Sequence, residues 1–178
     1  MNRKWNYYID ASTTNMGIVL CCEDTKEILI TSLSFKKYRN KDKQTALSHY
    51  HKLSCIHGIL QAFTQDFPPS LHIVMEGIFI QPRFKNSSEI LLKLHGMLMT
   101  IFMGRNFSFI PPASVKKAIT GRGDVPKSKV RETLEEKYGT EFKNEDESDA
   151  FALLVSDFIQ NHKMIEEYDI KNVSYIEK

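Results

Sequence analysis

Apolar and polar positions alternate in blocks along the first part of the chain. Runs rich in aromatic and β-branched residues predict three strands, at about Trp5 to Ala11, Met16 to Cys22 and Glu27 to Phe35. The links between these runs are short and polar, so successive strands are expected to be antiparallel neighbours in a meander. The first two strands form a hairpin, and Asp10 stands at the end of its first strand.

The middle of the chain combines helical and strand-like patterns. Apolar residues at three- and four-residue spacing predict two amphipathic helices, at about Thr45 to Phe63 and Ser87 to Met103. Two short apolar runs fit buried strands, Leu71 to Gly77 and Phe107 to Ile110. Glu76 stands at the C-terminal end of the first of these runs, where open α/β sheets place their chemistry.

Three more helices are predicted beyond this last strand. A short helix covers Ser114 to Thr120, a second opens at Pro126 and stops at Gly139, and a third begins near Asp146. The order of elements predicts an α/β fold with a central mixed five-stranded sheet, in which three antiparallel strands are followed by two further strands, flanked by helices. We expect a single domain over 1–161 and a polar C-terminal tail over 162–178.

Composition limits the class of protein. The chain has 178 residues, of which 42% are hydrophobic and 26% charged, as in one globular domain with a real core. No apolar stretch has the length of a membrane helix, and the N-terminal pattern predicts no secretion signal. The three cysteines, Cys21, Cys22 and Cys55, fit neither a disulfide framework nor a zinc site, and indicate a reducing cytoplasm.

The net charge is only +2, but acidic and basic residues are strongly segregated along the chain. The stretch 36–43 holds five basic residues and one acid, and 116–131 holds six basic residues against Asp124. The stretch 141–149 holds five acids and one lysine. Two basic stretches and one acidic stretch could together bind a polyanion and a cation. Solvated loops are the simpler explanation of any one basic stretch.

Four acidic residues stand where a rigid element ends or begins. Asp10 and Glu76 end strands, while Asp146 and Asp149 are three apart and share one face of a helix start. Carboxylate oxygens on rigid elements suit Mg²⁺. Two such ions roughly 4 Å apart can activate a water and stabilise the leaving oxygen of a phosphodiester. Because four gathered acids would repel each other without cations, the set indicates a metal site more strongly than any one member does.

Each acid also has a structural explanation. Asp10 can cap its own turn by accepting a hydrogen bond from a following amide, and Glu76 can be a surface residue at a strand end. Asp146 and Asp149 can stand at the helix start because the helix dipole favours negative charge there. These alternatives stay open for each residue taken alone.

Five motifs occur in a fixed order along the chain. They are strand-Asp-x-Ser-x-x-x-x-Gly from Asp10, strand-Glu-x-x-Phe from Glu76, Ser-Val-Lys-Lys-Ala-Ile-Thr-Gly from Ser114, Pro-Lys-Ser-Lys-Val from Pro126, and Asp-x-x-Asp-Ala-Phe-Ala from Asp146. In this order and spacing they resemble the RuvC-type Holliday junction resolvases of the RNase H-like (retroviral integrase) superfamily, which include phage-type members. The resemblance runs from about residue 7 to residue 159, and it implies an RNase H-like nuclease domain over 1–161.

The resemblance also implies roles for the four acids and for several basic residues. Asp10, Glu76, Asp146 and Asp149 match the catalytic metal-binding acids. The basic residues match DNA-contacting positions: Lys116 and Lys127 are implied to be catalytic, near the scissile phosphate, with Lys117, Arg122 and Lys129 as auxiliary DNA contacts. For each basic residue, a solvated helix face remains the structural alternative.

Phe79, three residues after Glu76, matches an aromatic residue that family members use against bases at the unstacked centre of the junction. Aromatic stacking on unpaired bases suits that role. A core phenylalanine at a strand end is the alternative explanation.

The function implied is that of a structure-selective, magnesium-dependent endodeoxyribonuclease of DNA recombination and repair. It would resolve four-way (Holliday) junctions by phosphodiester hydrolysis with paired symmetric nicks. We expect two Mg²⁺ ions per site, for which Mn²⁺ can substitute, and a homodimer, because two sites fit a symmetric pair of cuts. Four-way or branched DNA is the expected partner, a membrane is not, and the expected location is the cytoplasm of a bacterium or of a phage's host.

Three other functions remain open. The first is a broader nuclease of the same superfamily, acting on branched DNA, flaps or RNA–DNA hybrids. The second is an ATPase half of the sugar or acetate kinase type, since residues 10–14 faintly resemble a phosphate-binding hairpin, although a second such domain and a Gly-rich adenosine loop are missing from the sequence. The third is a non-catalytic junction-binding protein, against which the four acids argue, because binding alone needs none of them.

Overall fold

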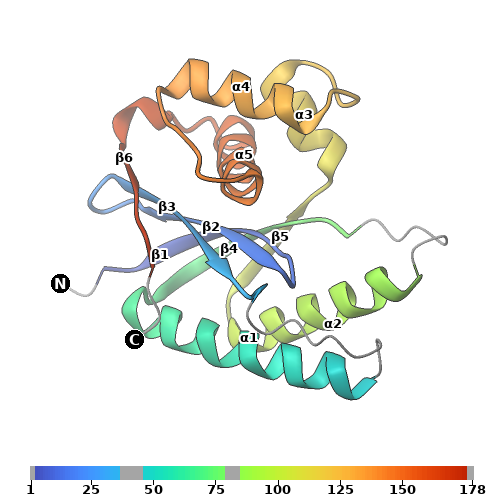
Figure 1. The fold of residues 1–178 in the computed structure, drawn as a ribbon. Helices are drawn as coiled ribbons and strands as arrows, with labels where there is room; N and C mark the ends of the chain where they lie inside the picture. The colour runs from blue at the N-terminus through green and yellow to red at the C-terminus, as the bar shows by residue number, and fades with distance from the viewer. Residues whose placement is uncertain (1–2, 37–45, 79–84, 176–178) are drawn as a thin grey trace.

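A mixed β-sheet runs through the middle of the molecule (Figure 1). The computed structural model describes residues 3–36, 46–78 and 85–175. The strands are β1 (Trp5–Asp10), β2 (Asn15–Cys22), β3 (Glu27–Ser34), β4 (Pro69–Glu76), β5 (Asn106–Ile110) and β6 (Asp169–Asn172). Their spatial order is β5-β4-β1-β2-β3-β6. The meander β1-β2-β3 is antiparallel, whereas β4, β5 and β6 each run parallel to the neighbour that they join.

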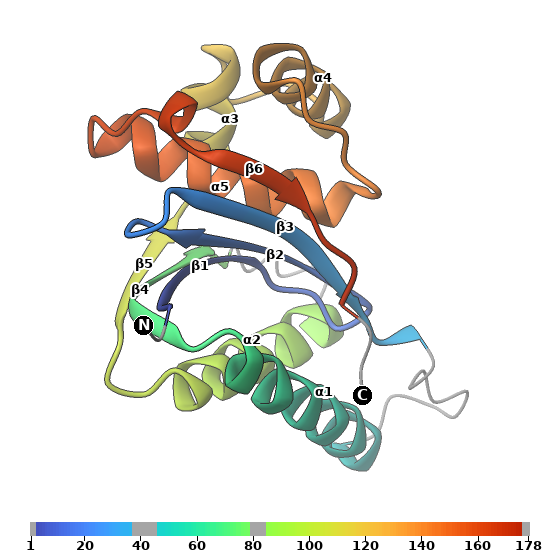
Figure 2. The same cartoon turned by 90° about the vertical axis from the view of Figure 1, so that its left-hand side faces the viewer.

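Helices cover both faces of the sheet. They are α1 (Ala46–Asp66), α2 (Lys85–Ile101), α3 (Pro112–Thr120), α4 (Lys127–Tyr138) and α5 (Glu145–Gln160). Figures 1 and 2 show α1 and α2 side by side under one face, and α5 against the other with α3 and α4 outside it. None of the described helices is long and apolar enough to cross a membrane.

Alternation along the strands divides the core into two halves. Tyr7 and Ile9 belong to the cluster on the side of α1 and α2, while Tyr8 belongs to the cluster on the side of α5. All three side chains are fully buried. A strand covered by helices on both faces has apolar residues at successive positions rather than at every second one, which explains the unbroken apolar runs in the sequence.

Within the described residues the sheet has six strands, one more than the sequence predicted, while the α/β class with a mixed sheet flanked by helices is confirmed. Strand β6 pairs in parallel with β3 and follows the short 3-10 turn η3 (Ile165–Glu167). It lies within the segment 162–178 that was predicted to be a polar tail. Its four residues include one apolar side chain, Ile170, so the sequence shows no hydrophobic alternation that would predict a strand. Backbone hydrogen bonds hold it to the sheet edge. The division into a domain over 1–161 and a tail stays a prediction.

Candidate active site

Two of the predicted acids lie at one edge of the sheet. Strands β1 and β4 are parallel neighbours, with Ile9 opposite Met75. Their last residues, Asp10 and Glu76, therefore reach the same carboxyl-terminal edge. This is the edge at which open α/β sheets bind their ligands.

The start of α5 brings the other two acids to this edge. Gly17 of β2 is paired with Asp10 across the hairpin. A Cβ atom on Gly17 would stand 1.8 Å from the backbone oxygen of Asp146, so the first turn of α5 rests directly on the glycine. Asp146 and Asp149 thereby join Asp10 and Glu76, and three separate elements supply the four carboxylates.

The carboxylates affect one another's protonation. Burial raises the pKa of Asp10 from 3.8 to about 7, and the negative charges of Asp149, Glu76 and Asp146 add to this rise. Burial also raises the pKa of Glu76 and that of Asp149. Raised pKa values show that too little positive charge surrounds these partly buried carboxyl groups. A bound cation would supply that charge.

Lys127 supplies positive charge to the group. Its ammonium nitrogen donates a hydrogen bond to Oδ2 of Asp149. Burial would lower the pKa of Lys127, but the hydrogen bond and the charges of Asp149, Asp10 and Glu76 raise it. The first turn of α4 thus places an ammonium among the acids.

The donor set fits a divalent metal in its chemistry. Four carboxylates provide hard oxygen ligands of the kind that Mg²⁺ prefers, and burial together with their mutual repulsion raises the pKa of Asp10. Within residues 3–36, 46–78 and 85–175, no three His, Cys, Asp or Glu side chains are gathered closely enough to hold an ion as they stand. Mg²⁺ usually keeps several of its waters and binds a protein through only one or two carboxylates.

Asn15 is a member of the site that the sequence argument missed. Its side-chain amide donates a hydrogen bond of 2.6 Å to Oδ2 of Asp146. Asn15 is the first residue of β2 and lies opposite Ser34 of β3, so the sheet fixes its position. No sequence signal marked this residue, because a polar residue in a hairpin link is ordinary.

A buried carboxylate, also missed, anchors the start of α5. Glu147 is 1% exposed. It accepts hydrogen bonds of 3.0 Å from the Ser32 hydroxyl and 2.8 Å from the Lys143 amide. Asn144 caps the helix by accepting from the Glu147 amide at 2.9 Å, and its own amide group donates to Ser32. The spacing of Asn144 and Glu147 is that of a capping box, a sequence signal that could have identified this anchor.

The predicted DNA-contacting residues of α3 and α4 are distributed around this edge. Lys116 donates a hydrogen bond of 2.7 Å to the Val125 carbonyl, and its charge acts on Glu76. Lys117 is exposed in the last turn of α3. Lys129 is exposed and pairs with Glu132 at 3.4 Å.

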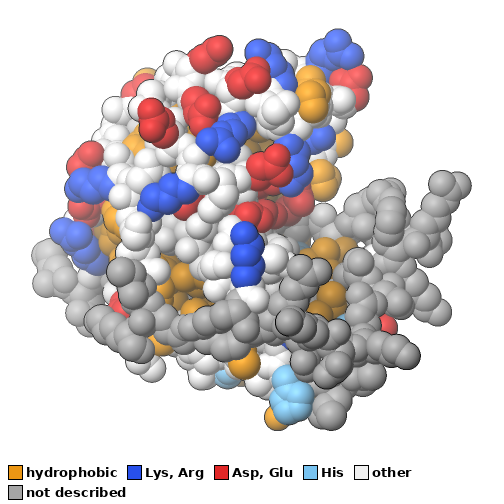
Figure 3. Space-filling model, in the orientation of Figure 1, with side chains coloured by type: hydrophobic (Ala, Val, Ile, Leu, Met, Phe, Trp, Pro, Cys, Tyr) orange, Lys and Arg blue, Asp and Glu red, His pale blue; other side chains and the backbone are white. Residues whose placement is uncertain are grey.

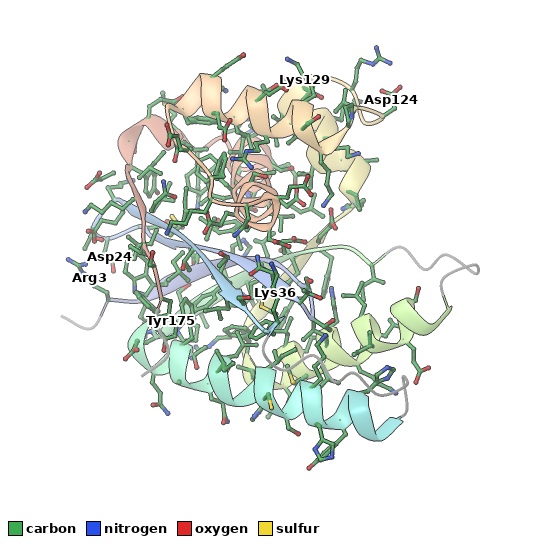
Figure 4. All side chains as sticks on the ribbon, in the orientation of Figure 1. Arg3, Asp24, Lys36, Asp124, Lys129 and Tyr175 are labelled. Carbon is green, nitrogen blue, oxygen red and sulfur yellow. The ribbon has the colours of Figure 1, made fainter. Side chains whose placement is uncertain are left out.

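Arg122 forms an exposed ion pair of 2.9 Å with Asp124 in the turn between α3 and α4. Figure 4 shows Asp124 and Lys129 at the outer border of this layer, away from the sheet. Figure 3 shows acidic and basic side chains interspersed over the layer formed by α3, α4 and α5. The structure thus brings Lys127 into the acidic group and leaves Arg122 and Lys129 on the outer surface, while Phe79 lies outside the described residues.

Comparisons with known proteins relate this fold to resolvases. No protein family matches the sequence, and no curated protein matches it. The structure of T. thermophilus RuvC in complex with a Holliday junction substrate superposes with a TM-score of 0.65 at 14% identity, over 89% of this chain and 95% of that one. A Thermus thermophilus RuvC structure gives 0.61 at 16% identity over 89% and 95%. The yeast mitochondrial Holliday junction resolvase Ydc2 gives 0.56 at 13% identity over 93% and 82%. The chain therefore has the RuvC-type, RNase H-like fold.

Proposed function

We propose that this RuvC-like chain is a structure-selective DNA endonuclease that resolves four-way junctions in the cytoplasm of a bacterium or of a phage's host. The observation that carries the proposal is the gathering of Asp10, Glu76 and Asp149 with Lys127 at one sheet edge. The fold supports the same substrate, because one similar structure holds a Holliday junction substrate and another is a mitochondrial junction resolvase.

The four acids would hold the metal, which we propose to be Mg²⁺ with Mn²⁺ as a substitute, two ions to a site. Such ions, when bound, supply Lewis acidity for the hydrolysis of a phosphodiester. Asp10 and Glu76 come from neighbouring strands, and Asp146 and Asp149 come from one helix turn. Ligands on rigid elements keep their positions when DNA binds, which favours a reaction that depends on orientation.

The basic residues around the site have a separate task. Lys127 and Lys116 lie near enough to affect the protonation of Glu76. Their ammonium groups can neutralise phosphate charge at the cut and in the transition state. Lys117, Arg122 and Lys129 would contact phosphates further away, where they position the DNA without reading its sequence.

Paired nicks on opposite strands need two active sites, and we propose that a homodimer supplies them. Leu92 and Met99 are exposed on α2, Met103 is exposed in the turn that follows it, and Phe109 is exposed on the edge strand β5. Exposed apolar side chains of this kind suit contact with a second copy of the chain. Light scattering should give the mass of a dimer, and Met99→Glu should lower that mass to a monomer's.

Cleavage of a labelled four-way DNA junction tests the function. The assay compares the junction with linear duplex, flap and RNA–DNA hybrid substrates, with and without Mg²⁺. We expect symmetric cuts near the crossover that require the metal. Asp10→Asn should abolish cleavage and keep junction binding, whereas Asp24→Asn, an exposed Asp-to-Asn change in the β2–β3 turn, should cleave normally.

Other outcomes of this assay point to other functions. Equal cutting of flaps would indicate a general branched-DNA nuclease, and preference for the hybrid would indicate a ribonuclease H activity. Junction binding without any cutting would contradict the catalytic role of the acids.

A further inference from the structure

Lys127 occupies the position of a cation in the acidic group. Its ammonium contacts Oδ2 of Asp149, and its charge acts on Asp10 and Glu76 as well. Asp149 retains only 18% of its side-chain exposure, whereas Lys127 retains 53%. The carboxylate is therefore held in place, while much of the lysine side chain faces solvent.

Asp149 cannot serve the lysine and a metal ion equally well. A divalent ion near Oδ2 would meet the positive charge of the ammonium at short range, and like charges repel. Oδ2 of Asp149 becomes available as an oxygen ligand for the ion once the ammonium has left it.

The backbone beneath Lys127 is anchored, so the side chain can move without it. Lys127 follows Pro126, which caps α4 in an extended conformation. The preceding carbonyl, that of Val125, accepts a hydrogen bond from Lys116. Buried Val130 and Leu134 fix α4 against the core. The four-carbon stem of a lysine lets its ammonium reach a new partner nearby.

We propose that Lys127 is an exchangeable counter-ion that leaves Asp149 when a divalent ion binds and then takes a phosphate of the DNA. No covalent bond changes in this exchange. Metal and DNA then favour each other. The ion frees the Lys127 ammonium, which a phosphate can bind, and the phosphate frees the Asp149 carboxylate, which the ion can bind. The inference rests on the proposed function, since it assumes the metal site.

The first test measures metal binding by the protein without DNA. Mn²⁺ binding is followed by electron paramagnetic resonance for the wild type and for Lys127→Met. Removal of the competing charge should tighten Mn²⁺ binding by about fivefold or more, the lower end of typical coupling between ligands. Lys127→Gln serves as a second variant without the charge, and both variants should lose cleavage activity despite binding metal better.

Lys137→Met is the matched control. It makes the same change in the last turn of the same helix, where the ammonium lies 5.1 Å from the centre of the Tyr138 ring. Its Mn²⁺ affinity should equal that of the wild type. Unchanged or weaker Mn²⁺ binding by both Lys127 variants would overturn the inference.

The second test measures coupling between metal and DNA. Ca²⁺ replaces Mg²⁺ so that the junction is bound but not cut, because Ca²⁺ coordinates with a looser geometry than Mg²⁺. A denaturing gel checks that the junction stays intact. In the wild type, Ca²⁺ should tighten junction binding by the factor by which the junction tightens Ca²⁺ binding. In Lys127→Met this factor should fall toward one, and an unchanged factor would contradict the exchange.

Failure of the proposed function gives a different result. If wild-type protein binds no Mn²⁺, or if Asp10→Asn leaves Mn²⁺ binding unchanged, then the acids are not a metal site and the counter-ion exchange is overturned with it. If the wild type binds Mn²⁺ through the acids but loss of Lys127 changes nothing, then only the exchange is overturned.

Discussion

Gly17 supports the backbone of Asp146 so closely that no side chain fits between them. A Cβ atom on Gly17 would stand 1.8 Å from the Asp146 carbonyl oxygen and 3.1 Å from the Glu147 nitrogen. The neighbours are backbone atoms, which cannot turn aside as a flexible side chain could. Because Gly17 is also the hairpin partner of Asp10, this contact sets the distance between β1 and the acids of α5.

Gly17→Ala should therefore displace the start of α5. We expect a loss of about 1–3 kcal/mol in the free energy of unfolding, as for overpacking of a core. We also expect at least a roughly hundredfold loss of cleavage, since small misplacements of catalytic groups cost about that much. Urea denaturation and junction cleavage measure the two effects.

Gly58→Ala is the matched control for this prediction. Gly58 lies in α1, and a Cβ atom there meets nothing within 4 Å. That variant should be stabilised by about 0.5–1 kcal/mol, because alanine restricts the unfolded chain. If Gly17→Ala keeps the stability and activity of the wild type, then the position of α5 does not depend on this contact.

Asp10→Asn should stabilise the metal-free protein at neutral and alkaline pH. The folded protein retains the Asp10 proton up to about pH 7, whereas its ordinary pKa is 3.8. The unfolded chain therefore binds fewer protons between these values, and the folded state loses stability as the pH rises through that window. The amide cannot ionise, so it should raise the free energy of unfolding at pH 8 by on the order of 1–4 kcal/mol.

The sign of this effect can be checked across pH and with metal. The difference between Asp10→Asn and the wild type should vanish toward pH 4, where both folded states are uncharged at this position. Added Mg²⁺ should stabilise the wild type more than the variant. Equal stability of the variant and the wild type at pH 8 without metal would mean that burial and the neighbouring acids do not raise the pKa of Asp10.

Asn15→Ala should weaken metal-dependent activity through Asp146. Loss of the 2.6 Å hydrogen bond frees the Asp146 carboxylate to rotate, and loss of such supporting partners typically costs about 10- to 100-fold in metal affinity or activity. Asn15→Asp should be worse, since it places a like charge beside Asp146.

The Mg²⁺ concentration that gives half-maximal cleavage is the measurement for Asn15. It should rise in both variants, and high Mg²⁺ should partly restore Asn15→Ala. Ser34→Ala, on the opposite strand, is exposed and should behave as the wild type. An unaltered Mg²⁺ requirement in Asn15→Ala would remove Asn15 from the site.

Glu147→Ala should destabilise the protein by about 2–4 kcal/mol, because it removes a buried carboxylate and leaves the half-buried Ser32 hydroxyl and the Lys143 amide without their acceptor. Glu145 is exposed in the same helix turn, and Glu145→Ala should cost only about 0.3–1 kcal/mol from the helix dipole. Thermal unfolding of the two variants compares them directly. Similar losses would indicate that Glu147 acts only through its charge at the helix start.

Much of the fold was predictable from local patterns. The hairpin around Asp10 and the strand ending at Glu76 follow from apolar runs and short polar links, which are properties of neighbouring residues. The turn at Gly139 was also visible, and the glycine there has a φ of 63°, the left-handed conformation that glycine tolerates best. Asp10 and Glu76 do lie at one sheet edge, because the ends of neighbouring parallel strands share an edge.

The remaining features depend on contacts that no local pattern contains. Strand β6 is polar and short, so only its pairing with β3 makes it a strand. Lys116 was predicted as a DNA contact, and the structure shows that its ammonium donates to the Val125 carbonyl. The role of Gly17 was likewise invisible, because its partner Asp146 is distant in sequence.

The sequence by itself determined the types and order of the elements up to α5, and the candidate acids, since periodicity and chain direction are local properties. Only the tertiary structure decided that Gly17 supports α5, that Asn15 holds Asp146, and that the Lys127 ammonium lies against Asp149. The physical reason is that packing brings together residues far apart along the chain, and a side chain's partner, burial and charge environment exist only once that packing is complete.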